Sequence, residues 1–281
     1  MRALKPLALV FCLLLAACVP VTRPVFKIGL VAPFEGRYRG VGYEVIYAVR
    51  LAVREANARG VAGHAVELLA LDDSGDAAMA VTQARKAAAD PQVVAVIGDW
   101  LDATTLAATP EYAAAGLPLL ATTAAPQLDP SASIFRLWPS AAALNAQITD
   151  TTTLRRGPPE WGDTPFFGAA GPDPSANAYL VAPAPMPADA ADATFADRFR
   201  AISNGVEPNA YSVLAYDAAR LLFDAVARAN GAAPSRAGVA AALLQSDYTG
   251  LSGQVSFNSG QAWAEAPGWR YRLQAGKIVQ P

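Results

Sequence analysis

Short apolar runs alternate with amphipathic segments along the first third of the chain. The runs are too short for helices and rich in branched side chains, which is typical of buried strands. Each amphipathic segment has apolar residues three and four positions apart, so it predicts a helix that buries one stripe. The expected strands are residues 26–32, 66–71 and 93–97, and the expected helices are residues 43–59 and 76–89.

Strands that alternate with helices of this length form right-handed βαβ units and a parallel sheet. The sequence therefore predicts an α/β fold for this region. In such sheets ligands bind beyond the carboxyl ends of the strands, so the loops there are candidates for a binding site. These loops are residues 33–42, 72–76, 98–105 and 121–126.

Five short sequences in this region resemble, in order and spacing, the first lobe of type I periplasmic binding proteins. Each is weak alone, but together they are specific. They are residues 27–36 (KIGLVAPFEG), 52–63 (AVREANARGVAG), 71–74 (LDDS), 96–98 (VIG) and 118–126 (PLLATTAAP). The closest resemblance is to the branched-chain amino-acid (leucine/isoleucine/valine) substrate-binding family of ABC transporters. It implies a two-lobed fold whose first lobe is a parallel sheet flanked by helices.

The amino terminus has the pattern of an export signal. A basic start precedes an apolar run over residues 6–17, which is too short to span a bilayer. Residues 15–18 (LAAC) resemble the cleavage site of a bacterial lipoprotein, in which the Cys18 thiol carries the lipid. We expect a lipoprotein signal at residues 1–18, a tether at residues 19–25, and membrane contact through the lipid anchor only. An ordinary secretory signal is the alternative.

Composition narrows the classes of function. A formal net charge of −2 gives no electrostatic footprint for nucleic acid or acidic lipid. Cys12 leaves with the signal, so we expect neither a disulfide nor a thiolate metal site, and one histidine does not support a zinc centre without cysteines. Residues 33–42 contain three glycines but match neither the dinucleotide nor the P-loop pattern. We therefore expect no metal, no cofactor and no nucleic-acid partner.

The first loop offers aromatic and charged side chains to a solute. Phe34, Tyr38 and Tyr43 are candidates for aromatic walls, and Glu35 or Arg37 is a candidate for contact with a charged group. For each residue the alternative is a solvated charge or a core aromatic.

Two carboxylates, Asp72 and Asp73, end the second expected strand. Such a pair can bind a cation or act as acid and base. The sequence Ser74-Gly75-Asp76 that follows favours a turn in which Asp76 caps the next helix. We prefer turn formation and capping to chemistry here.

The third loop departs from the family pattern. In the amino-acid-binding branch, the resemblance implies a serine hydroxyl that holds the α-carboxylate of the ligand, and the matching position here is Asp102 or a neighbour. Because two carboxylates repel each other, this departure argues against a plain α-amino acid. Asp99 and Asp102 suit a cationic group, on which Trp100 could stack; capping aspartates and a buried tryptophan are the alternative. The candidate hydroxyl groups in this loop and the next are those of Thr104, Thr122 and Thr123.

The chain after residue 139 matches a shortened second lobe. Residues 149–165 are polar without an apolar strand pattern, and matching resumes at strands expected in residues 165–171 and 178–183, where Tyr179 is a candidate ligand contact. The resemblance implies that roughly a hundred residues of this lobe are missing. The other expected elements are helices at residues 141–148, 194–202, 209–229 and 236–245 and edge strands at residues 251–257, 269–273 and 277–279.

These elements predict two lobes. The first comprises residues 26–140 and 194–250, and the shortened second lobe comprises residues 141–193 and 251–281. We expect an exported, lipid-anchored protein that captures a small polar solute, an amino acid or related compound, for an ABC permease in the membrane. No catalysis is expected, since we find no nucleophile elbow, histidine pair or metal cluster. The alternatives are a ligand-free interaction module of the cell envelope and the poorly folding product of an internal deletion.

Overall fold

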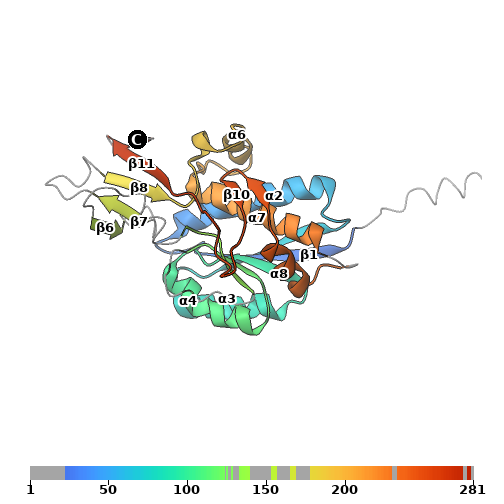
Figure 1. The fold of residues 1–281 in the computed structure, drawn as a ribbon. Coiled ribbons are helices and arrows are strands. Elements are labelled where there is room, and N and C mark those ends of the chain that lie inside the picture. The colour runs from blue at the N-terminus through green and yellow to red at the C-terminus, as the bar shows by residue number, and fades with distance from the viewer. Residues whose placement is uncertain are drawn as a thin grey trace, which may run out of the picture.

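The computed structural model describes residues 23–123, 125, 128, 133–139, 153–156, 165–168, 178–229, 233–274 and 277–279. Within these residues the chain forms two five-stranded sheets and one two-stranded sheet. Figure 1 shows the two larger sheets side by side, with most of the helices packed around the first.

Five strands form the first sheet: β1 (Val25–Ala32), β2 (Ala65–Asp72), β3 (Val93–Gly98), β4 (Leu119–Ala121) and β5 (Ile134–Arg136). All their pairings are parallel, and the strand order is β2-β1-β3-β4-β5. The central strand β3 is buried along its whole length, as expected where helices cover both faces of a sheet. The apolar runs predicted β1, β2 and β3 to within one residue at each end, so the α/β prediction is confirmed.

Five helices pack on this sheet: α2 (Arg39–Arg59), α3 (Ala77–Ala89), α4 (Asp102–Ala114), α7 (Ala210–Arg228) and α8 (Arg236–Leu244). α2, α7 and α8 share one hydrophobic core with the sheet, and α3 and α4 share a second core on the opposite face. Figure 1 shows α3 and α4 below the sheet and α2 and α7 above it. α2 begins before the expected residue, so Tyr43 lies within the helix instead of at its start.

The second sheet consists of β6 (Thr153–Arg156), β7 (Pro165–Gly168), β8 (Ala178–Ala182), β11 (Trp269–Gln274) and β12 (Lys277–Val279). Its strand order is β12-β11-β8-β7-β6, and every pairing is antiparallel. β7, β8, β11 and β12 were predicted, whereas the expectation of no strand in residues 149–165 was wrong. β6 carries the polar sequence Thr-Leu-Arg-Arg, so its strand conformation depends on pairing with β7 and leaves no apolar pattern.

β9 (Tyr248–Gly250) and β10 (Gly253–Val255) form a separate antiparallel pair. The turn between them is held by Asp217 of α7, whose carboxylate accepts hydrogen bonds from the Leu251 and Ser252 amides at 2.8 and 2.7 Å. The expectation that residues 251–257 supply an edge strand to the second sheet was therefore wrong, because this segment is tied to a helix of the first sheet.

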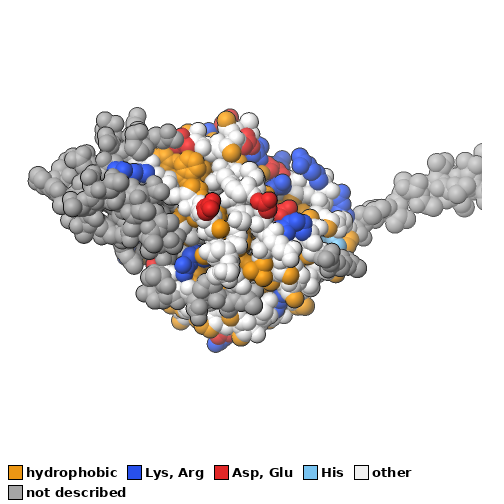
Figure 2. Space-filling view, in the orientation of Figure 1, with side chains coloured by type: hydrophobic (Ala, Val, Ile, Leu, Met, Phe, Trp, Pro, Cys, Tyr) orange, Lys and Arg blue, Asp and Glu red, His pale blue; other side chains and the backbone are white. Residues whose placement is uncertain are grey.

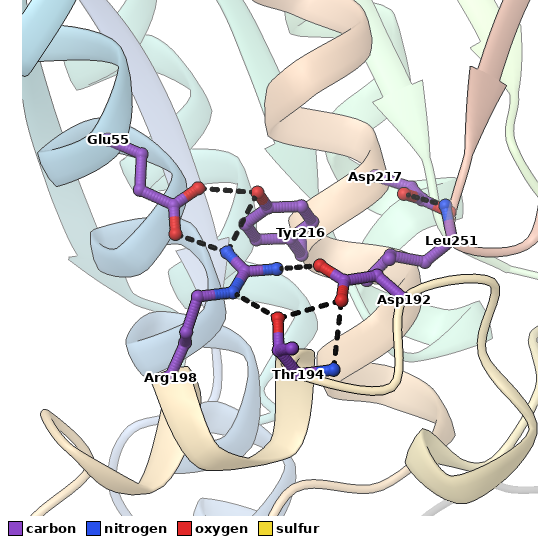
Figure 3. A network of polar contacts seen from close by, with 7 residues as sticks. All are labelled: Glu55, Asp192, Thr194, Arg198, Tyr216, Asp217 and Leu251. Atoms are coloured by element: carbon purple, nitrogen blue, oxygen red, sulfur yellow. Dashed lines mark hydrogen bonds and ion pairs between the residues drawn. The ribbon is translucent and has the colours of Figure 1, made fainter.

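A short helix, α6 (Phe195–Arg200), is fastened to α2 and α7 by a group that we call the Arg198 cluster, shown in Figure 3. The Arg198 guanidinium pairs with Glu55 of α2 and, at 2.5 Å, with Asp192, and it lies 5.5 Å from the centre of the Tyr216 ring on α7. The Tyr216 hydroxyl donates a 2.5 Å hydrogen bond to Glu55, and the Thr194 hydroxyl donates a 2.7 Å bond to Asp192. Ion pairs thereby join α6 to α2, and the Tyr216 hydroxyl and ring add α7 to the same cluster.

On the face drawn in Figure 2, positive and negative side chains lie interspersed among hydrophobic ones. This mixture is consistent with the small formal net charge of −2.

Among the helices that the structure describes, none combines the length and hydrophobicity of a membrane span. The predicted signal at residues 1–18 and helix at residues 141–148 lie outside the described residues. The boundaries proposed for the two lobes stay a prediction.

Candidate functional site

The loops that follow β1, β2, β3 and β4 meet at one edge of the first sheet, because all four strands run parallel. Asp72, the last residue of β2, ties the loop after β1 to this edge. Its Oδ1 accepts hydrogen bonds from the amides of Phe34, Glu35 and Ser74 at 2.8, 3.3 and 2.9 Å. Burial alone would raise the pKa of Asp72, but these bonds and the Ser74 hydroxyl outweigh it and lower the pKa. Asp72 is therefore a structural anion, as the turn interpretation predicted.

The predicted aromatic residues of the first loop lie at different depths. Phe34 is half-buried and packs against the main core, while Glu35 is exposed. Tyr38 is half-buried beside Gly75, where an added Cβ atom would lie 2.8 Å from the Tyr38 ring. Tyr43 is 41% exposed on α2. Phe34 and Tyr38 thus pack against other residues, whereas Tyr43 is open to solvent.

The third loop is shorter than expected, because α4 begins at Asp102 and not after Thr105. Both threonines of its first turn use their hydroxyl groups locally. Thr104 donates to the Leu101 carbonyl oxygen at 3.0 Å, and Thr105 donates to the Asp99 carbonyl oxygen at 2.6 Å. Asp102 does not cap the helix, but its negative charge in the first turn is favoured by the helix dipole. Thr104 is therefore fully buried and engaged, whereas Asp102 is half-buried.

Asp102 and Thr123 come together across two loops. The Thr123 hydroxyl donates a short hydrogen bond to the Asp102 carboxylate and accepts one from the Ala125 amide at 3.2 Å. Beside them, the half-buried Arg136 guanidinium donates to the carbonyl oxygens of Ala125 and Leu128 at 3.0 and 2.8 Å. Burial lowers the pKa of Arg136, and Asp102 opposes that shift. Arg136 was not predicted, although it ends the last parallel strand at the same sheet edge.

A group of three aromatic side chains lies behind this edge. Trp100, two residues beyond the end of β3, contacts Tyr211 of α7 edge-on, with ring centres 6.0 Å apart. Trp138, which follows β5, lies 6.0 Å from the same ring. All three are buried, with Trp100 only 3% exposed. Trp100 therefore packs in the protein here, as the alternative interpretation held, and Trp138 and Tyr211 are members that the sequence pattern did not indicate.

Asp99 and Thr122 lie deeper than the other candidates. Neither is exposed, and the Thr122 hydroxyl donates to the Asp99 carbonyl oxygen at 3.3 Å. Burial, together with the charge of Asp73, raises the pKa of Asp99 well above its usual range. Asp99 is therefore enclosed in the protein, and Asp102 is the carboxylate of this loop that remains half-open to a solute.

Sequence and structure comparisons agree with this architecture. A family model for periplasmic binding proteins matches residues 25–162 and 161–277. The chain belongs to the periplasmic binding protein family. None of the curated proteins compared with the sequence matches it.

Solved periplasmic binding proteins share the fold at low sequence identity. The branched-chain amino-acid transporter substrate-binding protein LivJ from Streptococcus pneumoniae, in complex with isoleucine, is 18% identical with a TM-score of 0.68, over 90% of this chain and 97% of that one. An extracellular ligand-binding receptor from Rhodopseudomonas palustris HaA2 is 17% identical with a TM-score of 0.73, over 91% and 99%. An ABC transporter solute-binding protein from R. palustris, in complex with benzoate, is 15% identical with a TM-score of 0.69, over 91% and 95%.

For two predicted residues of this periplasmic binding protein, the structure describes no side chain. Cys18 lies outside the described residues, and only the backbone of Tyr179 is placed, in β8 of the second sheet. Among the described residues, no group of three or more histidine, cysteine, aspartate or glutamate side chains could hold a metal ion. The structure thus brings together Asp102, Thr123 and the loop that carries Phe34 at one sheet edge.

Proposed function

We propose that this protein is an extracytoplasmic solute-binding lipoprotein of an ABC importer. In this proposal it captures a small polar solute, an amino acid or related compound, between the edge of the first sheet and the second sheet, without catalysis. The observation that supports it best is the contact between Asp102 and Thr123, which sets a half-buried carboxylate at the sheet edge where α/β folds bind ligands. Closure of two lobes around a solute would then expel water from this carboxylate.

The polar groups at the edge favour a solute that carries a cationic or amine group. Asp102 offers a carboxylate, whereas the hydroxyl groups of Thr104 and Thr122 are directed at backbone carbonyl oxygens. A solute carboxylate would therefore meet the charge of Asp102 without a free hydroxyl from either threonine, and the Arg136 guanidinium beside it already donates to two backbone carbonyl oxygens. Related structures contain isoleucine and benzoate, so the fold accommodates solutes of different chemistry. Phe34, Tyr38 and Tyr43 are proposed as the apolar surroundings, with the buried Trp100 as the packing behind them, and Glu35 and Tyr179 are proposed as further contacts.

We further propose that Cys18 carries the lipid and that the permease of the importer is the membrane partner. The family supports an extracytoplasmic location, and the signal-like amino terminus supports the anchor. Labelling with radioactive fatty acid tests the anchor: label should enter the chain and be lost in Cys18→Ser.

Isothermal titration calorimetry of the mature chain against pooled amino acids, polyamines, amides and short peptides tests solute binding. We expect saturation at one solute per chain. Asp102→Asn should weaken the binding of a cationic solute about tenfold or more, because a hydrogen bond to a charged group is lost. Asp197→Asn is the matched control, since Asp197 is an exposed carboxylate on α6 and its loss should leave the affinity unchanged.

An interaction module without a solute is the second candidate. It is favoured by one observation: Asp99, Thr104 and Thr122 are fully buried, so few polar groups remain free at the edge. A chain that melts cooperatively but gives no heat with any pool would support this candidate against the importer proposal.

A further inference from the structure

Two buried carboxyl groups lie beneath the proposed cleft. Asp73 follows β2 and Asp99 follows β3, on either side of β1, and both side chains are 0% exposed. Tyr112 of α4 is also 0% exposed, and its hydroxyl faces Asp99. These three groups take no part in the proposed contacts with solute.

Most polar atoms of this group lack an ordinary partner. Asp73 Oδ1 accepts a hydrogen bond from the Gly75 amide at 2.9 Å. Asp73 Oδ2, both carboxyl oxygens of Asp99 and the Tyr112 hydroxyl make no hydrogen bond of ordinary geometry to a described residue, although Tyr112 is near enough to lower the pKa of Asp99. Unpaired polar atoms at full burial are costly, and ionised ones are far more so. The group therefore needs an arrangement that satisfies four atoms at once.

The surrounding charges make double ionisation unfavourable. Among the described residues, the titratable groups that face the pair are Asp72 at the end of β2, Asp76 in the turn after it and Tyr112 of α4, and none of the three is a cation. Burial raises the pKa of Asp73 to about 6, and the charges of Asp72 and Asp76 add to this rise. Burial and the charge of Asp73 raise the pKa of Asp99 further. Two negative charges at this depth would face each other without compensation.

We propose that Asp73 and Asp99 share one proton and act as a positioning pair for the loops that follow β2 and β3. Asp99 carries the proton and donates it to the free Oδ2 of Asp73, while the Tyr112 hydroxyl donates to the other oxygen of Asp99. In this arrangement one proton together with one phenol gives each of the four unpartnered atoms a hydrogen-bond partner.

The backbone contacts of the pair connect it to the sheet edge. The Asp73 amide donates to the Ala32 carbonyl oxygen at 3.2 Å, which fixes the turn against the end of β1. The Asp99 carbonyl oxygen accepts from the hydroxyls of Thr105 and Thr122. Loss of the shared proton therefore places a second charge where three loops meet and loosens them. The idea that these loops bind solute rests on the proposed function, but the shared proton does not.

The test is the pH dependence of urea unfolding of the mature protein without solute. The folded state holds a proton that the unfolded chain releases once the pH exceeds the usual aspartate pKa. Stability should therefore fall as the pH rises from about 4.5 through 6 and beyond, by about tenfold in the unfolding constant per pH unit for each retained proton. Asp99→Asn should remove most of this slope. Asp73→Asn should remove less, because burial still raises the pKa of Asp99, and the two effects should not add in the double variant.

Glu44→Gln is the control for an unrelated, half-buried acid. Burial raises the pKa of Glu44 to about 7, although its hydrogen bond with Asn209 opposes the rise. Glu44 lies on α2, so its contribution to the slope should add to that of Asp99→Asn in the combined variant. Additive slopes for Asp73→Asn and Asp99→Asn as well would show two independent carboxyls and overturn the shared proton.

Infrared spectroscopy covers the case in which a variant fails to fold. At pH 7, in the Glu44→Gln background, we expect the stretching band of a protonated carboxyl group. It should be lost in Asp99→Asn, which carries the proton, and shifted in frequency in Asp73→Asn, which removes the acceptor. No such band in the folded parent would overturn the proposal. Neither experiment uses a solute, so failure to find a solute and failure of the shared proton are separate results.

Discussion

The Arg198 cluster and the Asp73–Asp99 pair differ in how their ionisable groups are partnered and buried. In the cluster, one guanidinium meets two carboxylates and a phenol, and Arg198 and Glu55 keep side-chain exposures of 31% and 29%. In the pair, two carboxyls are 0% exposed and meet no cation in the described structure. The first arrangement keeps its charges, whereas the second reduces its charge by holding a proton. Access to a partner, more than depth alone, decides the protonation state.

Asp217 stands between these two cases. It is 1% exposed, like the pair, but its oxygens accept from the Leu251 and Ser252 amides. Burial raises the pKa of Asp217 to about 6, and the hydrogen bonds with Ser252 and Leu251 hold it down. The hydrogen bonds thus limit the rise in the pKa of Asp217, whereas burial and the charge of Asp73 raise the pKa of Asp99 well above its usual range.

Asp217→Ala should give the largest effect. It leaves two amides of the β9–β10 turn without an acceptor, so we expect a loss of about 3 kcal/mol in the free energy of unfolding, measured by urea denaturation. Asp224→Ala is the control on the same helix, because Asp224 is a more exposed carboxylate that pairs with Arg228. An equal loss in the two variants would contradict the role given to the turn amides.

Arg198→Met should have a smaller effect. Methionine keeps part of the contact with Tyr216 but removes the pairs with Glu55 and Asp192, and these carboxylates can still reach water. We expect a loss of about 1–2 kcal/mol, reduced at high salt because partly exposed charges are screened. Arg200→Met, which removes a more exposed arginine from the same helix, should change stability less. A loss that does not respond to salt would mean that packing, not charge, fastens α6.

Asp76→Ala should have the smallest effect on stability, but it should also change the titration of the carboxyl pair. Asp76 caps α3 through the Met79 amide at 2.8 Å, and its loss should cost about 1 kcal/mol. Since the charge of Asp76 raises the pKa of Asp73, the variant should also reduce the pH slope of stability between about pH 4.5 and 6. Ser235→Ala removes the equivalent cap of α8 and should lower stability without changing the slope. If the pH slope of stability were the same in Asp76→Ala and Ser235→Ala, Asp76 would have no influence on the carboxyl pair.

Elements that carry their own end signals were predictable from the sequence. Asp76 caps α3, and Asn209 caps α7 through a capping box, so both helices begin where the pattern placed them. The branched apolar runs likewise predicted three strands of the first sheet, because the pattern lies within each strand itself. β6 was missed because its conformation depends on pairing with β7, which no local pattern records.

The candidate site was predictable only where a loop supplies its own residues. Asp102 and Thr123 were both candidates, but their contact joins two loops and depends on how far α4 extends toward the sheet. Tyr211 could not be placed, because it meets Trp100 only after α7 returns to the first sheet. The depth of Asp99 was hidden for a similar reason: Tyr112, which covers it, lies further along α4.

The return of α7 also bears on how the protein can be made. α2 packs extensively against α7, and the Tyr216–Glu55 bond spans 161 residues of sequence. A ribosome delivers the amino-terminal half first, so for most of synthesis α2 and β1 exist without the helix that covers them. The apolar face of α2 therefore lacks its native cover until α7 has emerged, and a segment ending before Ala210 should expose this face to chaperones instead of folding.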